Sequence, residues 1–371
     1  MGETISRDAK RLGFDESAIG AAFRVLRSAV DSGIFPGYVA LVARKQRVVA
    51  RSCHGWRMLV PERREMGLDT IFDVASLTKV VVTTTALMKL VEEGKLRLGD
   101  RVSEILEEFS SEKQKTITVK HLLTHTSGLP AWIPFFKKAT GREEVLRLVL
   151  ATDPEFQPGT REVYSDLNFI LLGTIVERTL GKRLDAVAKE KIFLPLGMKD
   201  SFFNPPRNLW GRIAATEEMK QEPRSGKVVL GEVHDENAYA MGGVAGHAGL
   251  FTTADDLARF CAMVLGLGTF RGKRILAPGT VRLMTRCQNQ NLGGCYGLGW
   301  MTNKEWDAGE LFSELSFGHT GFTGTSVWMD PEIEVSTVLL TNAVHPSREH
   351  KSLASVRARF NNAVAASIGE A

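Results

Sequence analysis

Apolar positions recur with two different periods along the chain, and this pattern separates helical from extended segments. Residues 16–33 carry apolar side chains three and four positions apart, which predicts an amphipathic helix. Residues 38–43 and 48–52 are short, contain valine and tyrosine, and flank a charged turn, which predicts two strands. The N-terminal part should therefore be a helix followed by a strand pair.

A buried helix is predicted next. Residues 70–74 have the composition of an extended approach, and the apolar positions after them continue to residue 91. Gly94 is the predicted end of this helix, because glycine accepts the left-handed conformation at a helix C-terminus. From there to about residue 200 the pattern is mainly helical and includes an apolar helix at residues 169–180.

The last third of the chain returns to strands. Residues 201–245 are irregular and rich in proline, glycine and charge, and a helix is expected at residues 252–265 with Thr253 as its N-cap. Strands are predicted at residues 296–302, 313–317, 325–329 and 335–341, and a closing helix at residues 351–367.

This order of elements predicts two domains. Strands near both ends of the chain, with helices between them, indicate a mixed domain built from residues 1–75 and 246–371. Residues 76–245 then form an inserted, mainly helical domain.

Composition limits the class of protein. The chain has 371 residues, of which 43% are hydrophobic and 24% charged, with a net charge of +4. These values are ordinary for a globular protein with a sizeable core. The charges are interleaved rather than blocked, so no nucleic-acid partner is expected.

The chain gives no sign of membrane attachment or export. No apolar run reaches the length of a membrane span, and the N-terminus lacks a hydrophobic signal core. Its loose match to a myristoylation pattern has no support elsewhere in the sequence. The four cysteines show no metal-type spacing, so we expect free thiols and a cytoplasmic protein.

The strongest chemical signal is the run Ser76-Leu77-Thr78-Lys79 at the start of the buried helix. A serine and a lysine three positions apart share one helix face, so the amine can reach the hydroxyl. A serine needs such a neighbouring base to become a nucleophile. Ser76 could alternatively be only an N-cap. A second Ser-x-x-Lys run, residues 110–113, lies in a polar stretch and is expected to be a solvated loop.

Two further motifs favour catalysis. Tyr164-Ser165-Asp166 precedes an apolar helix, and His319-Thr320-Gly321 opens a strand-like stretch that continues to Trp328. The order Ser-x-x-Lys, Tyr-x-Asn and Lys-Thr-Gly marks penicillin-recognising serine enzymes. From about residue 20 to 345 the chain resembles that superfamily, most of all the class C β-lactamase branch with its related esterases and D-alanyl-D-alanine peptidases.

The resemblance implies a fold and a set of roles. The fold is of the α+β class, an antiparallel sheet flanked by helices, with the active site in the cleft between the two domains. Ser76 is the expected nucleophile, Lys79 holds or accepts its proton, and Tyr164 is the partner acid and base, partly ionised beside the lysine. The backbone N–H groups of Ser76 and Phe322 would form the oxyanion hole. Tyr164 could alternatively be a core tyrosine.

Two residues depart from the family pattern. Asp166 replaces an asparagine at a substrate-binding position. Because an ionised carboxylate cannot donate a hydrogen bond, the alternative to substrate contact is that Asp166 pairs with Lys79. His319 replaces a lysine and is largely neutral above pH 7, which weakens the case for a substrate carboxylate. His319 could also be a structural residue at a strand end. Thr320 and Gly321 fit the pattern, and glycines at 321 and 324 would let a substrate approach the strand.

The remaining candidates are weaker. His121, His125 and His247 lack the spacing of a metal site, so we expect His121 and His125 to be structural and infer neither metal nor cofactor. Aromatic side chains in one loop could line the cleft or pack in the core; they are Trp132, Phe135 and Phe136.

The predicted function is that of a serine hydrolase, most of all a carboxylesterase for short to medium acyl esters. A β-lactamase or D-alanyl-D-alanine carboxypeptidase is the alternative within the superfamily. A penicillin sensor that is acylated without turnover is the alternative of another class. The expected partner is a small ester, amide or β-lactam; the sequence leaves the oligomeric state open.

Overall fold

The computed structural model describes residues 2–220, 222–302, 305–349 and 352–369 of the chain. Met1 and Ala371, the limits of the predicted mixed domain, lie outside these residues. Lys351, the first residue of the predicted closing helix, lies outside them as well.

An antiparallel sheet brings the two ends of the chain together. Its strand order is β1-β3-β2-β13-β12-β11-β10, with β4 paired to β3. At its centre β2 (Gly37–Arg44) pairs with β13 (Val335–Thr341) along the whole length of both strands. The other strands of this sheet are β1 (Gly2–Ile5), β3 (Arg47–Met58), β4 (Arg64–Glu65), β10 (Met301–Thr302), β11 (Phe317–Thr320) and β12 (Ser326–Asp330).

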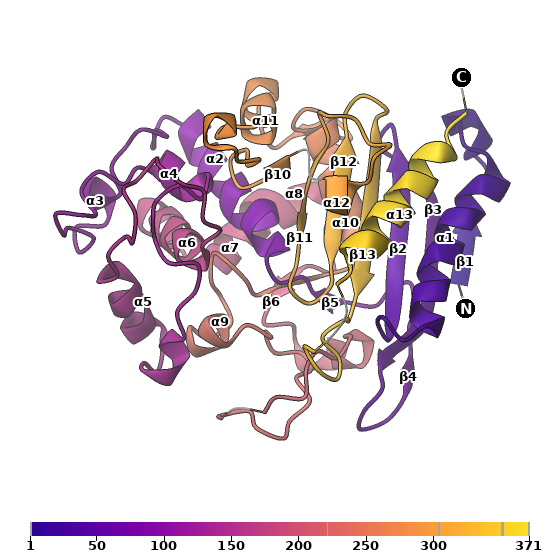
Figure 1. Ribbon diagram of the computed structural model, residues 1–371, viewed down its shortest axis with the longest axis horizontal. Helices are drawn as coiled ribbons and strands as arrows, with labels where there is room; N and C mark the ends of the chain where they lie inside the picture. The colour runs from indigo at the N-terminus through magenta and orange to yellow at the C-terminus, as the bar shows by residue number, and fades with distance from the viewer. Residues whose placement is uncertain (1, 221, 303–304, 350–351, 370–371) are drawn as a thin grey trace.

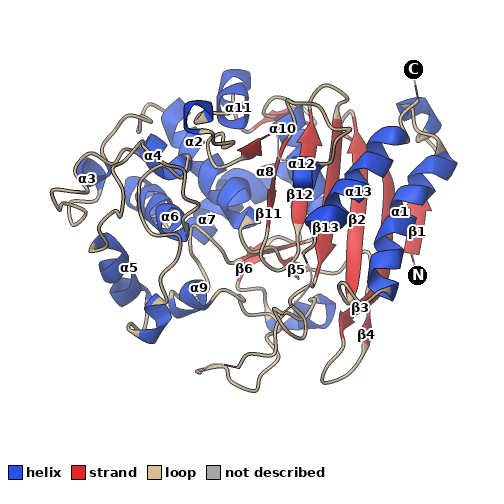
Figure 2. Cartoon of the chain, viewed as in Figure 1, coloured by secondary structure: helices blue, strands red, loops and turns tan. Residues whose placement is uncertain are grey.

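Helices cover both faces of this sheet (Figures 1 and 2), as the resemblance implied. Helices α1 (Glu16–Asp31) and α13 (Ala354–Ala366) pack together on one face, and α10 (Ala254–Leu265) packs on the other. Successive residues of β2 therefore enter two different cores, Val39 on the side of α10 and Ala40 on the side of α1. Burial of both faces explains why this strand is apolar throughout.

The middle of the chain is mainly helical and lies beside the sheet (Figure 2). Its first element is a π-helical segment, Lys79–Thr84, that continues into α2 (Thr85–Glu92). No helix in the described ranges has the length and apolar content needed to cross a membrane. The other helices are α3 (Val102–Ile105), α4 (Val119–Leu123), α5 (Arg142–Leu150), α6 (Asp166–Leu180), α7 (Leu184–Ala188), α8 (Leu194–Leu196), α9 (Glu236–Ala240), α11 (Pro278–Thr285) and α12 (Glu305–Ala308).

Two small sheets complete the fold. One joins the approach to Ser76 to the segment after residue 245, in the order β5-β7-β6. The other pairs β8 with β9. The strands of the two small sheets are β5 (Phe72–Asp73), β6 (Phe202–Phe203), β7 (Leu250–Thr252), β8 (Thr269–Phe270) and β9 (Lys273–Arg274).

Several local predictions are confirmed. Thr253 caps α10, because its hydroxyl accepts a hydrogen bond from the Asp256 N–H at 3.3 Å. Gly94 ends the helix that contains α2 with a φ of +68°. The second Ser-x-x-Lys run, residues 110–113, is fully exposed. All four cysteines are free thiols.

Other strand predictions are wrong. Residues 313–316 form a turn instead of a strand, because the Asp330 carboxylate accepts hydrogen bonds from the Ser313 N–H and hydroxyl at 2.6 and 2.8 Å. The strand begins at Phe317, so His319 and Thr320 end β11 rather than opening a strand. Residues 296–300 turn at Gly299, whose φ is +79°, and leave only two residues in β10.

The N-terminal strand β1 was not predicted. Its four residues, Gly2-Glu3-Thr4-Ile5, show no apolar periodicity, and they pair with β3 from Gly2↔Cys53 to Ile5↔Ala50. An edge strand that bonds through its backbone needs little apolar periodicity, so its sequence carries no strong signal.

Candidate active site

Ser76 stands on a strained turn between β5 and the π-helical segment. The preceding residue, Ala75, has a φ of +46°, which is unfavourable for any residue other than glycine. The buried Asp73 holds this turn, because its Oδ1 accepts a hydrogen bond from the Ala75 N–H at 2.9 Å. Thr78 holds it from the other side by donating its hydroxyl to the Ala75 carbonyl at 2.6 Å. Strain of this kind is typical of functional positions.

Lys79 is fully buried beneath Ser76, and its amine has several polar partners, including the Tyr164 hydroxyl. Its Nζ donates to the Ser76 hydroxyl at 2.9 Å and to the His247 carbonyl at 3.1 Å. The Asp166 Oδ1 lies 2.7 Å from the same Nζ, so the predicted pairing of Asp166 with Lys79 is present. The amine can therefore exchange protons with either the serine or the carboxylate.

The surroundings fix the protonation of Lys79 and Tyr164. Burial lowers the pKa of Lys79, but the Asp166 carboxylate and Tyr164 outweigh it, and the pKa is raised. Burial likewise raises the pKa of Tyr164 more than Lys79 lowers it. In the resting site the lysine is therefore an ammonium and the tyrosine a neutral phenol. The raised pKa of Tyr164 favours a neutral phenol over the partly ionised one expected from the sequence.

His125 supports Tyr164 from behind. It is fully buried, and its ring centroid lies 4.5 Å from that of Tyr164. Its Nδ1 accepts a hydrogen bond from the Ser165 N–H at 3.0 Å, and burial holds its pKa well below the usual value, so it stays neutral. His121 is structural as predicted, because it forms a capping box with Thr118 at the start of α4. Among the described residues, no group of three or more potential metal ligands lies together.

His319 is a buried neutral side chain at the end of β11. Its Nδ1 donates a hydrogen bond to the Thr320 carbonyl at 2.8 Å. Burial, together with the nearby Lys79 charge, lowers its pKa to about 3. The position that carries a cation in β-lactamases is therefore uncharged here, as the sequence predicted above pH 7.

Gly321 is required by the packing of the protein itself. A Cβ at this position would lie 2.2 Å from the Thr325 Oγ1 and 2.5 Å from the Val74 carbonyl oxygen. The turn after β11 thus packs directly against the approach to Ser76. This close contact, rather than access for a substrate, explains the glycine. Gly324 has a φ of +106°, a backbone conformation that favours glycine at this position.

The two expected oxyanion-hole donors are both available. Within the described part of the chain, neither the Ser76 nor the Phe322 backbone N–H donates to an acceptor in the protein. The Phe322 side chain is 56% exposed and stacks on His234 at 5.7 Å. Free N–H groups on adjoining segments suit the stabilisation of a developing oxyanion.

These residues surround a cavity of about 570 Å³. Lys79 contacts Ser76 from behind, and Gly321 packs against Val74 rather than lining the cavity. The predicted site residues that line the cavity are Ser76, Tyr164, Asp166, His319, Thr320 and Phe322. Of the three aromatic candidates, Trp132 lines this cavity, Phe135 is buried in the core and Phe136 lines a neighbouring cavity.

Five polar residues of this cavity were not predicted as site residues. Arg348 comes from the segment after β13. The other four come from residues 234–247, in and just after the irregular region; they are His234, Asp235, Glu236 and His247. The region 201–245 has no periodicity, so only the folded chain identifies its wall residues. His247 had been considered only for a metal site.

Arg348 brings a positive charge to the cavity, but two carboxylates hold it. Its guanidinium contacts Glu217 at 2.5 Å and Glu236 at 2.7 Å. His247 is paired in the same way, with its Nε2 2.8 Å from the Asp235 Oδ1. Among the described lining residues, the cavity therefore offers no unpaired lysine or arginine to a substrate.

The comparisons with known proteins agree with this geometry. A profile of the family described as Beta-lactamase matches residues 22–361. An N-acetylmuramyl-L-alanine amidase of Bacillus subtilis (strain 168) is 34% identical over 346 residues, covering 84% of this chain and 78% of the relative. A protein of Escherichia coli (strain K12), named as a candidate D-alanyl-D-alanine carboxypeptidase, is 32% identical and covers 91% of this chain and 85% of its own length.

Two solved structures have the same fold. EstCE1, a hydrolase with promiscuous acyltransferase activity, superposes with a TM-score of 0.75 at 25% identity, covering 94% of this chain and 99% of its own. A penicillin-binding protein homolog from Caulobacter crescentus has a TM-score of 0.77 at 22% identity over 99% of this chain and 100% of that one. The second likeness concerns the fold alone.

Proposed function

The chain belongs to the beta-lactamase family of serine hydrolases, and on this premise we propose that it is a carboxylesterase that forms an acyl-enzyme on Ser76. The observation that carries the proposal is the hydrogen bond of 2.9 Å from the buried Lys79 Nζ to the Ser76 hydroxyl. This hydrogen bond links the serine on the strained turn to an amine that can accept the serine's proton.

The first step requires that Lys79 lose its extra proton. Asp166 is the acceptor in direct contact, 2.7 Å away. Once neutral, Lys79 takes the Ser76 hydroxyl proton while the oxygen attacks the ester carbonyl. The resulting oxyanion is held by the backbone N–H groups of Ser76 and Phe322.

Tyr164 completes acylation as the general acid. As a neutral phenol, it donates its proton to the leaving alcohol when the carbon–oxygen bond breaks, and Lys79 restores that proton. In deacylation water attacks the ester of Ser76, its proton passes back through Tyr164 and Lys79, and the serine regains its hydrogen. The roles of both groups reverse between the two steps.

The charge of the cavity supports a neutral ester over a carboxylate-bearing substrate. His319 is uncharged, and Arg348 is already paired with two carboxylates. A D-alanyl-D-alanine carboxypeptidase or β-lactamase must desolvate a substrate carboxylate, which is costly without an opposing charge. EstCE1, a hydrolase with promiscuous acyltransferase activity, supports acyl transfer on this fold.

An amidase is the second candidate function. The B. subtilis relative, which is 34% identical, is named as an amidase that acts on an N-acetylmuramyl-L-alanine linkage. The same acylation on Ser76 would serve, with an amine as the leaving group and Tyr164 as its acid. A cytoplasmic location stays a prediction for either function.

Steady-state turnover of p-nitrophenyl butyrate, nitrocefin and an N-acetylmuramyl-L-alanine peptide tests the proposal. We expect fast ester turnover, little nitrocefin hydrolysis, and loss of turnover in Ser76→Ala. Ser110→Ala, in the exposed Ser-x-x-Lys run, is the matched control and should be fully active.

Each other result points elsewhere. Faster release of the peptide than of nitrophenol favours the amidase, and comparable nitrocefin turnover favours the β-lactamase or peptidase. A single equivalent of product per enzyme indicates the sensor. Residual turnover in Ser76→Ala removes Ser76 from the mechanism.

A further inference from the structure

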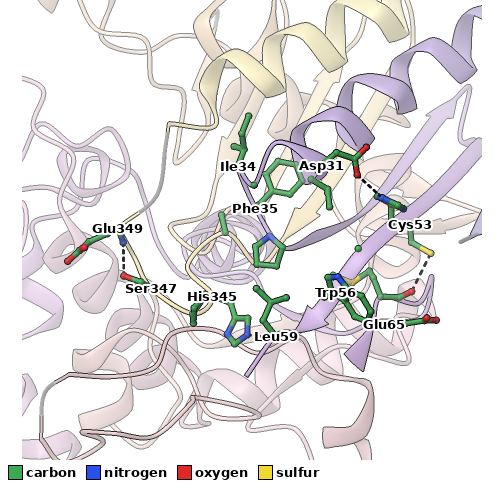
Figure 3. Close-up of a pocket in the computed structure, with 18 residues that line it drawn as sticks. Asp31, Ile34, Phe35, Cys53, Trp56, Leu59, Glu65, His345, Ser347 and Glu349 are labelled. Carbon is green, nitrogen blue, oxygen red and sulfur yellow. Dashed lines mark hydrogen bonds and ion pairs between the residues drawn. The ribbon is translucent and has the colours of Figure 1, made fainter. Parts of the chain in front are cut away.

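A second cavity, of about 650 Å³, lies outside the catalytic site (Figure 3). Its walls come from the end of α1, the loop 33–36 before β2, strand β3, residues 65–66 and the segment 343–349 after β13. That segment serves both cavities, because Arg348 lines the catalytic cavity while Ser347 and Glu349 line this one. No described residue lines both cavities, so the second cavity is a separate place for a ligand.

The interior of this second cavity is apolar and partly aromatic. Figure 3 shows Ile34, Phe35, Trp56 and Leu59 around the hollow. Phe35 is buried, whereas the other three are partly exposed and can still be covered. Partly exposed apolar walls around a cavity of this size are typical of a site for a small organic molecule.

The acidic residues that line this cavity are Asp31, Glu65 and Glu349. Asp31 and Glu65 lie on one side in Figure 3, and Glu349 lies on the opposite side. None of the described residues that line the cavity is a lysine or arginine. The whole chain has a net charge of +4, so this acidic surface is a local feature.

These carboxylates are only weakly engaged. Asp31 lies 3.4 Å from the His54 Nε2, and its side chain is 70% exposed. Glu349 meets Lys220 at 3.3 Å, but both side chains are largely exposed. Within the described residues the Glu65 carboxylate has no ion-pair partner within 4.0 Å. Exposed pairs of this kind are worth little and exchange readily for another cation.

The chain itself shows that the aromatic wall accepts a cation. The guanidinium of the exposed Arg63 lies 5.4 Å from the centroid of the Trp56 ring. A quaternary or protonated amine on an aromatic face is stabilised in the same way. An aromatic wall beside carboxylates therefore complements a molecule that is both cationic and apolar.

We propose that this second cavity binds a small organic cation, with its ammonium group near Asp31 and Glu65 and its apolar body against Trp56. The apolar body is held by burial, and the charge selects cations over neutral or anionic molecules of the same shape. The proposal is independent of the reaction at Ser76.

Isothermal titration with phenyltrimethylammonium tests the proposal on the whole chain. We expect one bound equivalent and an affinity that falls as salt is added. Benzenesulfonate, which has the same ring and the opposite charge, should not bind. Equal binding of the two probes, or no binding of either, would overturn the proposal.

Charge variants locate the bound cation. Asp31→Asn combined with Glu65→Gln should weaken binding about threefold to tenfold, the size expected for two exposed charge pairs. Glu332→Gln combined with Glu334→Gln removes two exposed carboxylates from the β12–β13 turn and should leave the affinity unchanged. All four carboxylates are exposed, so both variants should fold, and a thermal melt verifies it.

A single variant excludes the catalytic cavity as the binding place. Glu236→Gln removes a carboxylate that lines the catalytic cavity and not the second one. Unchanged affinity in this variant supports the proposal. Loss of binding in Glu236→Gln, with full binding in the Asp31 and Glu65 variant, would contradict it.

Discussion

At the scale of single residues, the site depends on how a buried lysine can become a base. Lys79 has a raised pKa because Asp166 and Tyr164 outweigh its burial, so the resting enzyme holds an ammonium. Asp166 both causes this state and, at 2.7 Å, can relieve it by accepting a proton. The family's asparagine would do neither. On the proposed mechanism, the departure at this position should therefore set the pH range of activity.

Asp166→Asn tests this role. Removing the carboxylate should lower the pKa of Lys79, because burial then acts against the ammonium with less opposition. The acidic limb of kcat/KM against pH should move down by about one to three units, the usual effect of a close opposite charge. Pre-steady-state acylation measured from about pH 6 to 12 gives the profile, because the pKa of a free lysine is already about 10.4 and that of Lys79 is raised.

The partly exposed Asp185→Asn variant, at the start of α7, is the control for this pH profile. An unchanged limb in Asp166→Asn would show that Lys79 is not the titrating base.

His319 makes a prediction about stability. Its pKa in the fold is about 3, against about 6.5 for a free histidine, so below pH 6.5 the unfolded chain takes up the proton first. Its contribution is present above pH 6.5 and is lost as pH falls toward 3. Between pH 7 and 5 this histidine should account for a loss on the order of 2 kcal/mol in unfolding free energy.

Denaturant unfolding of wild type and His319→Gln at pH 7 and pH 5 measures this effect. The variant should lose less stability over this interval than the wild type. Equal losses would mean that His319 is not buried and neutral in the folded protein.

At the scale of elements, the site is built where short segments from distant parts of the chain are fixed to one another. The buried Asp73 accepts hydrogen bonds from the Ala75 N–H and the His234 N–H, and Thr323 donates to its carbonyl. One residue thus connects the Ser76 turn, the irregular wall and the β11–β12 turn. Both oxyanion donors belong to segments held in this way.

Gly321→Ala should disturb this junction. A Cβ would lie 2.5 Å from the Val74 carbonyl oxygen, so the β11–β12 turn must move away from the Ser76 approach. We expect a loss of about 1–3 kcal/mol in unfolding free energy. The accompanying shift of the Phe322 N–H should lower kcat for the ester about tenfold to a hundredfold.

The matched control is Gly279→Ala, where no atom lies within 4 Å of the added Cβ. It should be fully active, and urea denaturation with ester kinetics compares the two variants. Full activity in Gly321→Ala would show that the close packing is not needed for catalysis.

The sequence predicted the motif-bearing elements better than their surroundings. Helix α10 and its cap at Thr253 follow from local side-chain chemistry, and so were predictable. Asp73, His234 and Arg348 act through contacts between segments more than a hundred residues apart, which leave no local pattern. The protonation of Tyr164 likewise depends on burial that only the folded chain creates.

At the scale of the whole molecule, the two ends of the chain form one packed layer. Helices α1 and α13 lie side by side on the sheet face away from α10, and Phe23 stacks on Phe360 at 6.2 Å (Figure 1). This core is a separate hydrophobic cluster from the larger one that includes the helical region. One edge of this cluster reaches Tyr296 and Met301 of the catalytic cavity, but Phe23 and Phe360 lie outside the cavity lining, so substitutions at these two positions should affect stability more than catalysis.

Phe360→Ala should reveal this separation. The side chain is 1% exposed, so its removal leaves a cavity and should lower the unfolding free energy by about 3–5 kcal/mol. The kcat/KM of the folded protein should stay within about twofold, because no active-site contact is removed. Thermal melting gives the loss of stability, and ester kinetics at low temperature give kcat/KM. A parallel loss of activity would mean that the layer positions the catalytic residues.

The central claim, that Ser76 carries the acyl group, is tested most directly by mass spectrometry. The enzyme is mixed with p-nitrophenyl butyrate, quenched in acid before the first turnover is complete, and digested. The account predicts one butyryl group on the peptide that contains Ser76, and none in Ser76→Ala. Turnover with no adduct, or an adduct on another residue, would contradict it.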